Sequence, residues 1–405
     1  MKKYLFILTA SFTLTGIKGQ TQNVWTQKAN LPSTARYGAV GFSIGTKGYI
    51  GTGQSGSVTL FNDFWEWDQG TNSWTQKANF GGTARHNAVA FSIGTKGYIG
   101  TGQDGSSYTN DFWEYDPSTN LWTPKSNFSG TIRGYAVGFS ISNKGYVGTG
   151  NDLSNYLNDF YEYNPSLDSW TQKTNFGGIA RWLATGLSIG LKGYISTGFN
   201  AGYKNDFWEY NQSNDTWIQK ANFPGTIRAE ASAFTIGNLG YVGIGTSLIA
   251  QSTESDFWEY DPSTNNWTQI ANFGGGRREF AVTFSIGNYG YVATGFRNDS
   301  ISTAQNDLWQ YGPRENGINE STYRHFLSIS PNPFSTQTTL HADRFFKNAS
   351  LTVCNSFGQT VKQIDNLTGQ TIIFHRDNLP SGLYCVRLTQ DGKTFSVDKF
   401  VITDK

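Results

Sequence analysis

The chain has 405 residues, with 31 Lys and Arg against 30 Asp and Glu, so its formal net charge at pH 7 is +1. This balance excludes the strong basic field that non-specific binding to nucleic acid requires, and it gives no acidic field either. We therefore expect no nucleic-acid partner.

Residues 1–19 have the features of a secretory signal peptide. Met1-Lys2-Lys3 precedes an apolar stretch from Tyr4 to Leu14, and small or polar residues continue to Gly19. The apolar stretch is too short to cross a bilayer, which needs about 20 apolar residues. Cleavage is expected before Gln20, and the mature chain is expected to have no membrane span.

Residues 20–312 contain an internal repeat in which a Trp is followed eleven residues later by an Arg. The six repeats begin at Trp25, Trp74, Trp122, Trp170, Trp217 and Trp267. Their spacing of 47 to 50 residues is typical of a four-stranded propeller blade. The repeat predicts an all-β fold with a six-bladed β-propeller.

Apolar periodicity and turn residues place four strands in each unit, and no segment of the repeats shows the 3.6-residue period of a helix. In the second unit we expect strands at residues 88–93, 96–102, 112–115 and 121–125. In the sixth unit, the third strand is not followed by any segment that resembles an outer strand. The segment from Asn23 to Ala29 is an outer strand without a blade, so we predict that it closes the sixth blade.

Residues 313–325 read as a polar linker, and residues 326–405 alternate as expected for a small Ig-like β-sandwich. The only two cysteines, Cys354 and Cys385, both lie in this tail. A disulfide between them and a pair of free, partly buried thiols are both compatible with the sequence.

Sequence variation between the repeats is confined to one face of the predicted propeller. The loops between second and third strands differ in length from 6 to 10 residues, and they share a face with the start of each innermost strand. The two positions after each repeated Arg also vary. A constant scaffold with one diversified rim is typical of a binding face. The candidate ligand-binding residues there are Tyr37, His86, Tyr135, Trp182, Glu230, Glu279 and Phe280.

The six repeated arginines allow two interpretations. They could form a positive ring that binds a carboxylate or sulfate. They could instead form structural pairs between neighbouring blades with the Asp that recurs from Asp63 to Asp307. The arginines are Arg36, Arg85, Arg133, Arg181, Arg228 and Arg278.

Two sets of motifs resemble known families. The order Arg, apolar strand, Gly-Tyr-Ile-Gly-Thr-Gly, Phe-Trp-Glu-Tyr-Asp-Pro and Asn-x-Trp resembles a kelch propeller of the galactose-oxidase-like group. The tail segments at 330–334, 355–359, 379–384 and 399–402 together resemble the C-terminal sorting domain of the type IX secretion system. This second resemblance implies a secreted or surface protein of a Gram-negative bacterium, with residues 326–405 recognised by outer-membrane secretion machinery.

The candidate residues favour binding over catalysis. The copper site of a galactose oxidase would need two His, but the propeller contains only His86, so we expect no metal and no other cofactor. Glu230 and Glu279 are weak candidates for acid–base chemistry on a sugar, as in kelch-like mutarotases. We therefore predict a non-catalytic module that binds glycans or proteins, with a sugar-modifying enzyme or a structural adhesion protein as alternatives.

Overall fold

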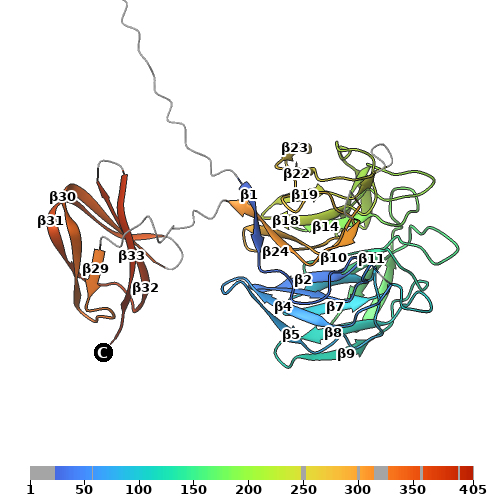
Figure 1. Cartoon of the computed structure of the whole chain (residues 1–405), viewed down its shortest axis with the longest axis horizontal. Helices are drawn as coiled ribbons and strands as arrows, with labels where there is room; N and C mark the ends of the chain where they lie inside the picture. Colours follow the sequence, from blue (N-terminus) through green and yellow to red (C-terminus); the bar gives the residue numbers. More distant parts are fainter. Residues whose placement is uncertain are drawn as a thin grey trace, which may run out of the picture. The chain divides into compact units, whose positions relative to one another are not determined.

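The computed structural model describes residues 23–313, except 57, 248–251 and 299–301, and residues 327–404, except 356–358 and 391–392. The chain divides into two compact units, residues 1–314 and 315–405. Every regular element among the described residues is a β-strand (Figure 1). The expected signal peptide, and the expected linker apart from Pro313, lie outside the described residues.

The first unit is a ring of six four-stranded antiparallel sheets, so the predicted six-bladed propeller is confirmed. Blade one contains β2 (Val40–Ile44), β3 (Lys47–Gly51), β4 (Phe64–Asp68) and β5 (Ser73–Lys77). Blade two contains β6 (Val89–Ile93), β7 (Lys96–Gly100), β8 (Phe112–Asp116) and β9 (Leu121–Lys125). Blade three contains β10 (Val137–Ile141), β11 (Lys144–Gly148), β12 (Phe160–Asn164) and β13 (Ser169–Lys173).

Blade four contains β14 (Thr185–Ile189), β15 (Lys192–Ser196), β16 (Phe207–Asn211) and β17 (Thr216–Gln219). Blade five contains β18 (Ser232–Ile236), β19 (Leu239–Gly243), β22 (Phe257–Asp261) and β23 (Asn266–Ile270). Blade six contains β24 (Val282–Ile286), β25 (Tyr289–Ala293), β28 (Leu308–Pro313) and β1 (Asn23–Lys28). Two further hairpins, β20 (Thr246–Ser247) with β21 (Ser252–Thr253) and β26 (Phe296–Arg297) with β27 (Thr303–Ala304), extend the longest loops.

The N-terminal strand closes the ring, as predicted. β1 pairs antiparallel with β28, with Trp25 opposite Tyr311. The indole of Trp25 donates a hydrogen bond of 3.1 Å to the carbonyl of Ala271, which follows blade five. In each of the five remaining blades, the indole of the outer-strand Trp also donates a hydrogen bond to a carbonyl in the segment that follows the preceding blade. The repeated Trp therefore joins adjacent blades around the whole circle.

Glycines allow the blades to approach closely. A Cβ on Gly97, in β7, would lie 2.1 Å from the ring of Phe42 in the preceding blade. In every blade, the glycine two residues after the end of the second strand lies against the segment that leads into an innermost strand. Gly53, for example, has a φ of +97°, and a Cβ there would lie 2.9 Å from Ala39. A side chain at either position would push these segments apart.

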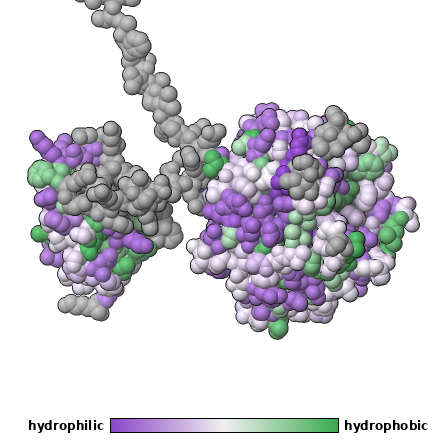
Figure 2. Space-filling model, viewed as in Figure 1, coloured by the Kyte–Doolittle hydropathy of each residue, from purple (hydrophilic) through white to green (hydrophobic). Residues whose placement is uncertain are grey.

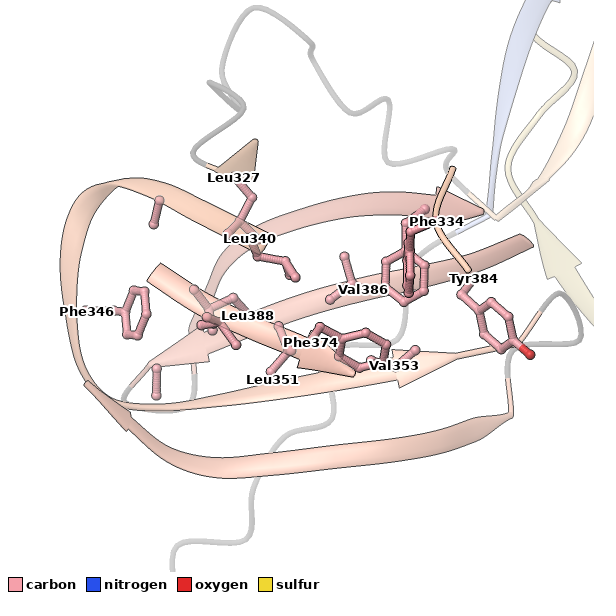
Figure 3. Packing of buried hydrophobic residues seen from close by; sticks show 14 of the residues in the cluster. Leu327, Phe334, Leu340, Phe346, Leu351, Val353, Phe374, Tyr384, Val386 and Leu388 are labelled. Atoms are coloured by element: carbon pink, nitrogen blue, oxygen red, sulfur yellow. The ribbon is translucent and has the colours of Figure 1, made fainter. Parts of the chain in front are cut away.

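The second unit is built from β29 (Leu327–Ser330), β30 (Gln337–Cys354), β31 (Thr360–His375), β32 (Gly382–Gln390) and β33 (Lys393–Ile402). β30 is long enough to pair with β29, β31 and β32, and register shifts interrupt its pairing with β31. These strands surround one apolar core that includes Leu340, Phe346, Phe374 and Leu388 (Figure 3). The unit is sandwich-like or barrel-like, which agrees with the predicted small β domain.

Candidate binding face

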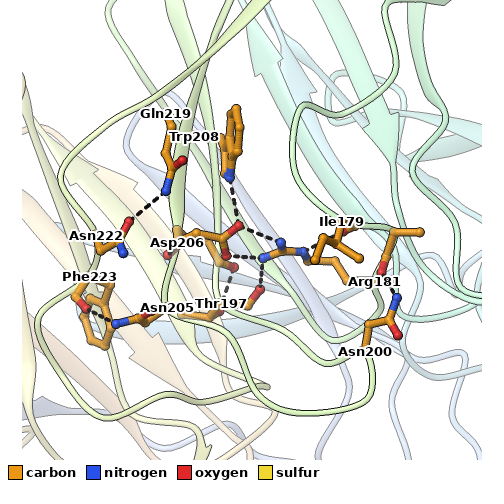
Figure 4. A network of polar contacts seen from close by, with 12 residues as sticks. Ile179, Arg181, Thr197, Asn200, Asn205, Asp206, Trp208, Gln219, Asn222 and Phe223 are labelled. Atoms are coloured by element: carbon orange, nitrogen blue, oxygen red, sulfur yellow. Dashed lines mark hydrogen bonds and ion pairs between the residues drawn. The ribbon is translucent and has the colours of Figure 1, made fainter.

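All six repeated arginines are buried and bound to aspartates. Each guanidinium forms two parallel hydrogen bonds to one carboxylate, with Nη1–Oδ1 distances of 2.5–2.6 Å and Nη2–Oδ2 distances of 2.7–3.0 Å. Figure 4 shows the pair formed by Arg181 and Asp206, where Nη1 also donates to the carbonyl of Thr197 and the indole of Trp208 donates to Asp206. This geometry leaves the arginines unable to present a positive ring to an anion.

The pairing differs from the expected contact between neighbouring blades. Arg181 leads into β14 and Asp206 precedes β16, so both belong to blade four, and the other five pairs repeat this arrangement. Burial by itself raises the pKa of Asp206, but the hydrogen bonds and charge of Arg181 outweigh it and lower that pKa below its ordinary value. Each ion pair therefore fixes the loop of its own blade.

The residue after each Arg joins the variable loop of the same blade. Tyr37 and Gln54 exchange two backbone hydrogen bonds of 2.9 and 3.0 Å, and the equivalent bridges occur in all six blades. The other five bridges are His86 with Gln103, Gly134 with Asn151, Trp182 with Phe199, Ala229 with Thr246 and Glu279 with Phe296. These bridges bring the variable loops and the variable strand starts together on one face.

The second residue after each Arg lies nearer the propeller axis and has a left-handed backbone. Its φ is between +50° and +60° in every blade, at Gly38, Asn87, Tyr135, Leu183, Glu230 and Phe280. Backbone hydrogen bonds of 2.8–3.3 Å link these residues from blade to blade at five of the six steps; among the described residues, none joins Glu230 to Phe280. Gly and Asn suit this conformation, whereas bulky residues adopt it at a cost.

These six residues and the alanine after each of them line a cavity of about 170 Å³ on the axis. The alanines are Ala39, Ala88, Ala136, Ala184, Ala231 and Ala281. Tyr135 and Phe280 belong to blades three and six, which are opposite each other in the ring, yet their ring centroids are only 6.3 Å apart. Phe280 also contacts Tyr37, at 5.9 Å between centroids. Aromatic side chains therefore span the mouth of the cavity.

Glu230 and Glu279 meet at a single hydroxyl group. The Oγ1 of Thr246 lies 2.8 Å from Oε2 of Glu230 and also contacts Oε2 of Glu279. A hydroxyl has one proton to donate, so it satisfies only one of two ionised carboxylates. Burial, together with the charge of Glu279, raises the pKa of Glu230 to about 8. Glu230 therefore keeps its proton at neutral pH and can donate a hydrogen bond.

The proton held by Glu230 predicts a pH-dependent stability. The folded protein holds a proton that the unfolded chain releases near the ordinary pKa of 4.5, so stability present at lower pH is lost as the pH rises toward about 8. Glu230→Gln should remove roughly 2–5 kcal/mol of this dependence, since one pKa unit corresponds to about 1.4 kcal/mol. Denaturant unfolding midpoints between about pH 5 and 9 measure it.

Glu114→Gln is the matched control, because Gln310 occupies the same place in blade six and accepts a hydrogen bond from Tyr291, as Glu114 does from Tyr98. The control variant should keep the pH dependence of the native protein. An identical pH profile for Glu230→Gln and the native protein would contradict the raised pKa of Glu230.

Trp182 lies outside the cavity lining, in a stack of aromatic rings. Its ring centroid lies 5.0 Å from that of Tyr135, and it stacks on the exposed Tyr156 at 5.9 Å between centroids. Its indole Nε1 is buried and has no hydrogen-bond partner in the described part of the protein. His86 is buried beside Asn87, and burial lowers its pKa, so its imidazole is neutral at physiological pH. Both residues extend the face beyond the cavity.

The structure thus separates the predicted site residues into two groups. Tyr135, Glu230 and Phe280 line the cavity, whereas Tyr37, His86, Trp182 and Glu279 form the surrounding bridges. The sequence interpretation did not select the alanines or the loop aromatics as site residues. The loop aromatics are Tyr108, Tyr156, Phe199, Tyr203 and Phe296. The alanine that recurs three positions after each of the six repeated arginines is the sequence signal that could have indicated the cavity wall.

On the side of the propeller drawn in Figure 2, hydrophilic and intermediate residues predominate. No helix in the described residues is long and apolar enough to cross a membrane. Within the same residues, no three His, Cys, Asp or Glu side chains are grouped so that they could hold a metal ion.

Comparison with known families agrees with both units. Residues 12–189 match the KLHDC2/KLHL20/DRC7 Kelch-repeats domain, and residues 328–403 match the secretion system C-terminal sorting domain. A solved structure titled "Structure of YjhT" is similar with a TM-score of 0.59 and 17% identity, over 69% of this chain and 96% of that chain. At this identity the likeness concerns the fold alone. No curated protein matches the chain.

The fold and these matches define a kelch-type β-propeller joined to an export domain. The propeller has a kelch-type fold, with residues 12–189 matching a kelch-repeats domain, and residues 328–403 of the C-terminal unit match a sorting domain of the type IX secretion system. Such a sorting domain implies that the protein is secreted or displayed at the cell surface.

Proposed function

We propose that this protein is a non-catalytic module that binds glycans through the axial cavity and the aromatic face around it, outside a Gram-negative cell. The observation that carries the proposal is the ring of left-handed residues. Tyr135, Leu183, Glu230 and Phe280 occupy a conformation that glycine and asparagine prefer, and their side chains line one cavity. Strained residues that converge on a pocket are more readily explained by a ligand than by stability.

The chemistry of the face suits a sugar. Aromatic rings can stack on the apolar faces of a sugar, and Tyr37, Tyr135 and Trp182 offer three of them. Asn87 and the Glu230–Glu279 pair supply both donors and acceptors for sugar hydroxyl groups. Since every repeated Arg is held in an ion pair, an acidic sugar has no free guanidinium of this set to bind. A neutral glycan end is therefore the best-matched ligand.

A glycan array probed with the full chain tests this proposal, followed by affinity measurements on the glycans retained. Tyr135→Ala and Trp182→Ala should each weaken binding at least about tenfold, because each removes a large aromatic contact, Tyr135 in the cavity lining and Trp182 beside it. Leu121→Ala, on the exposed outer strand of blade two, is the control and should bind as the native protein does. Absence of any retained glycan would exclude glycan binding, and native affinity in both variants would exclude binding through this face.

A second candidate, a sugar-modifying enzyme, is favoured by the Glu230–Glu279 pair. Glu230 keeps its proton at neutral pH beside a second carboxyl group, and such a carboxyl can serve as a general acid. The same retained glycans distinguish the two functions. Glu230→Gln would leave glycan affinity largely intact but abolish chemical conversion of the bound sugar if the protein were an enzyme, whereas a binding module converts nothing.

A further inference from the structure

The two cysteines of the sorting unit lie directly opposite each other on neighbouring strands. β30 and β32 pair antiparallel, and their register places Cys354 opposite Cys385 and Val353 opposite Val386. Residues that face each other in this way have Cα atoms about 4.5–5.5 Å apart. A disulfide requires a Cα separation of about 4.4–6.8 Å, so no movement of the strands is needed to join them.

Both thiols also lie on the outer side of the sheet. Val353 and Val386 are fully buried in the apolar core, and side chains alternate between the two faces along a strand. Cys354 and Cys385 therefore point away from the core, and Cys385 is exposed while Cys354 is half-buried. An oxidant in solution can reach Cys385, and Cys354 is its direct neighbour across the sheet.

We propose that Cys354 and Cys385 are oxidised to a cross-strand disulfide once the chain has left the cytoplasm. The sorting domain implies passage to an oxidising compartment, where such bonds persist. The oxidant is a disulfide-bearing molecule, such as the disulfide form of a thiol oxidoreductase. The thiolate of Cys385 attacks one sulfur of that disulfide and forms a mixed disulfide. The thiolate of Cys354 then attacks the sulfur of Cys385 and releases the oxidant as a dithiol, which takes up the two cysteine protons.

The disulfide would fasten the end of β30 to β32 and enclose the whole of β31 in a covalent loop. Such a loop restricts the unfolded chain, and so it stabilises the folded unit relative to the unfolded one. The expected consequence is a sorting unit that resists thermal unfolding more strongly when it is oxidised, while the propeller, which contains no cysteine, is unaffected.

The test uses full-length protein collected from the periplasm and treated with an alkylating reagent without reductant. Peptide mapping by mass spectrometry should show both cysteines protected and the peptides of Cys354 and Cys385 linked within one chain, with both alkylated after reduction. Full alkylation before reduction would overturn the proposal. A bond that joins two chains would also overturn it.

Calorimetry of the full chain tests the stabilising role. Replacing both cysteines, by Cys354→Ser and Cys385→Ser together, should lower the unfolding temperature of the sorting unit by at least about 5 °C relative to the oxidised protein. The reduced native protein should match the double variant, and the propeller transition should not move. Equal sorting-unit transitions in the oxidised protein and the double variant would refute stabilisation by the disulfide.

Discussion

Removal of residues 326–405 is expected to abolish export and leave the protein inside the cell envelope. The deleted segment contains the match to the secretion system C-terminal sorting domain at residues 328–403. The propeller forms a separate compact unit within residues 1–314, so the truncated protein should still fold. Cell fractionation in a host with a type IX system should find native protein outside the cell and truncated protein in the periplasm.

The control for this deletion is the fold of the truncated protein. Its propeller unfolding transition should coincide with that of the full chain, which shows that retention is not a result of misfolding. A reciprocal fusion of residues 315–405 to an unrelated periplasmic protein should carry that protein out of the cell. Appearance of the truncated propeller in the medium, at native levels, would contradict the sorting role of the tail.

Arg181→Met is expected to destabilise the propeller by about 3–5 kcal/mol. The substitution keeps an unbranched apolar side chain against the ring of Phe176, but it leaves the partly buried carboxylate of Asp206 without its bidentate partner. It also leaves the carbonyl of Thr197 without its 2.8 Å hydrogen bond. Denaturant unfolding of the full chain, followed by tryptophan fluorescence, measures the loss.

Two companion variants sharpen this result. Replacing both partners, with Arg181→Met and Asp206→Leu together, should recover part of the stability because no unpaired charge remains. Lys192→Met removes a half-exposed cation 4.0 Å from Glu209 in the same blade and should cost less than about 1 kcal/mol. A loss as small as this for Arg181→Met would mean that the repeated Arg is dispensable for folding.

Much of the architecture was predictable because it depends on local patterns that recur six times. The period of 47 to 50 residues, the turn residues and the orphan strand at Asn23 were enough to predict six blades and their closure by β1. The strand bounds shifted by only one or two residues, as at Ala88, which precedes β6 rather than opening it. Each strand pairs with a neighbour close in sequence, except where β1 meets β28.

The candidate site was less predictable, since its geometry depends on contacts between distant blades. The sequence indicated a variable face but could not show that the residue after each Arg pairs with a loop while the next residue lines the axis. Nor could it show that Thr246 brings Glu230 and Glu279 together. The expected pairing of arginines between blades was wrong, because each Arg and its Asp lie in two loops of the same blade. Pairing of that blade's strands in the folded sheet brings these two loops together.

The sequence by itself determined the number of blades, the closing strand and the face that varies, because periodicity and turn chemistry act within a few residues of the chain. Only the tertiary structure decided how that face is used. It placed the arginines in buried ion pairs, held six residues in left-handed conformations around one cavity and brought Tyr135 of blade three against Phe280 of blade six. These relations arise when the ring closes, since closure alone brings residues from opposite blades to the same axis.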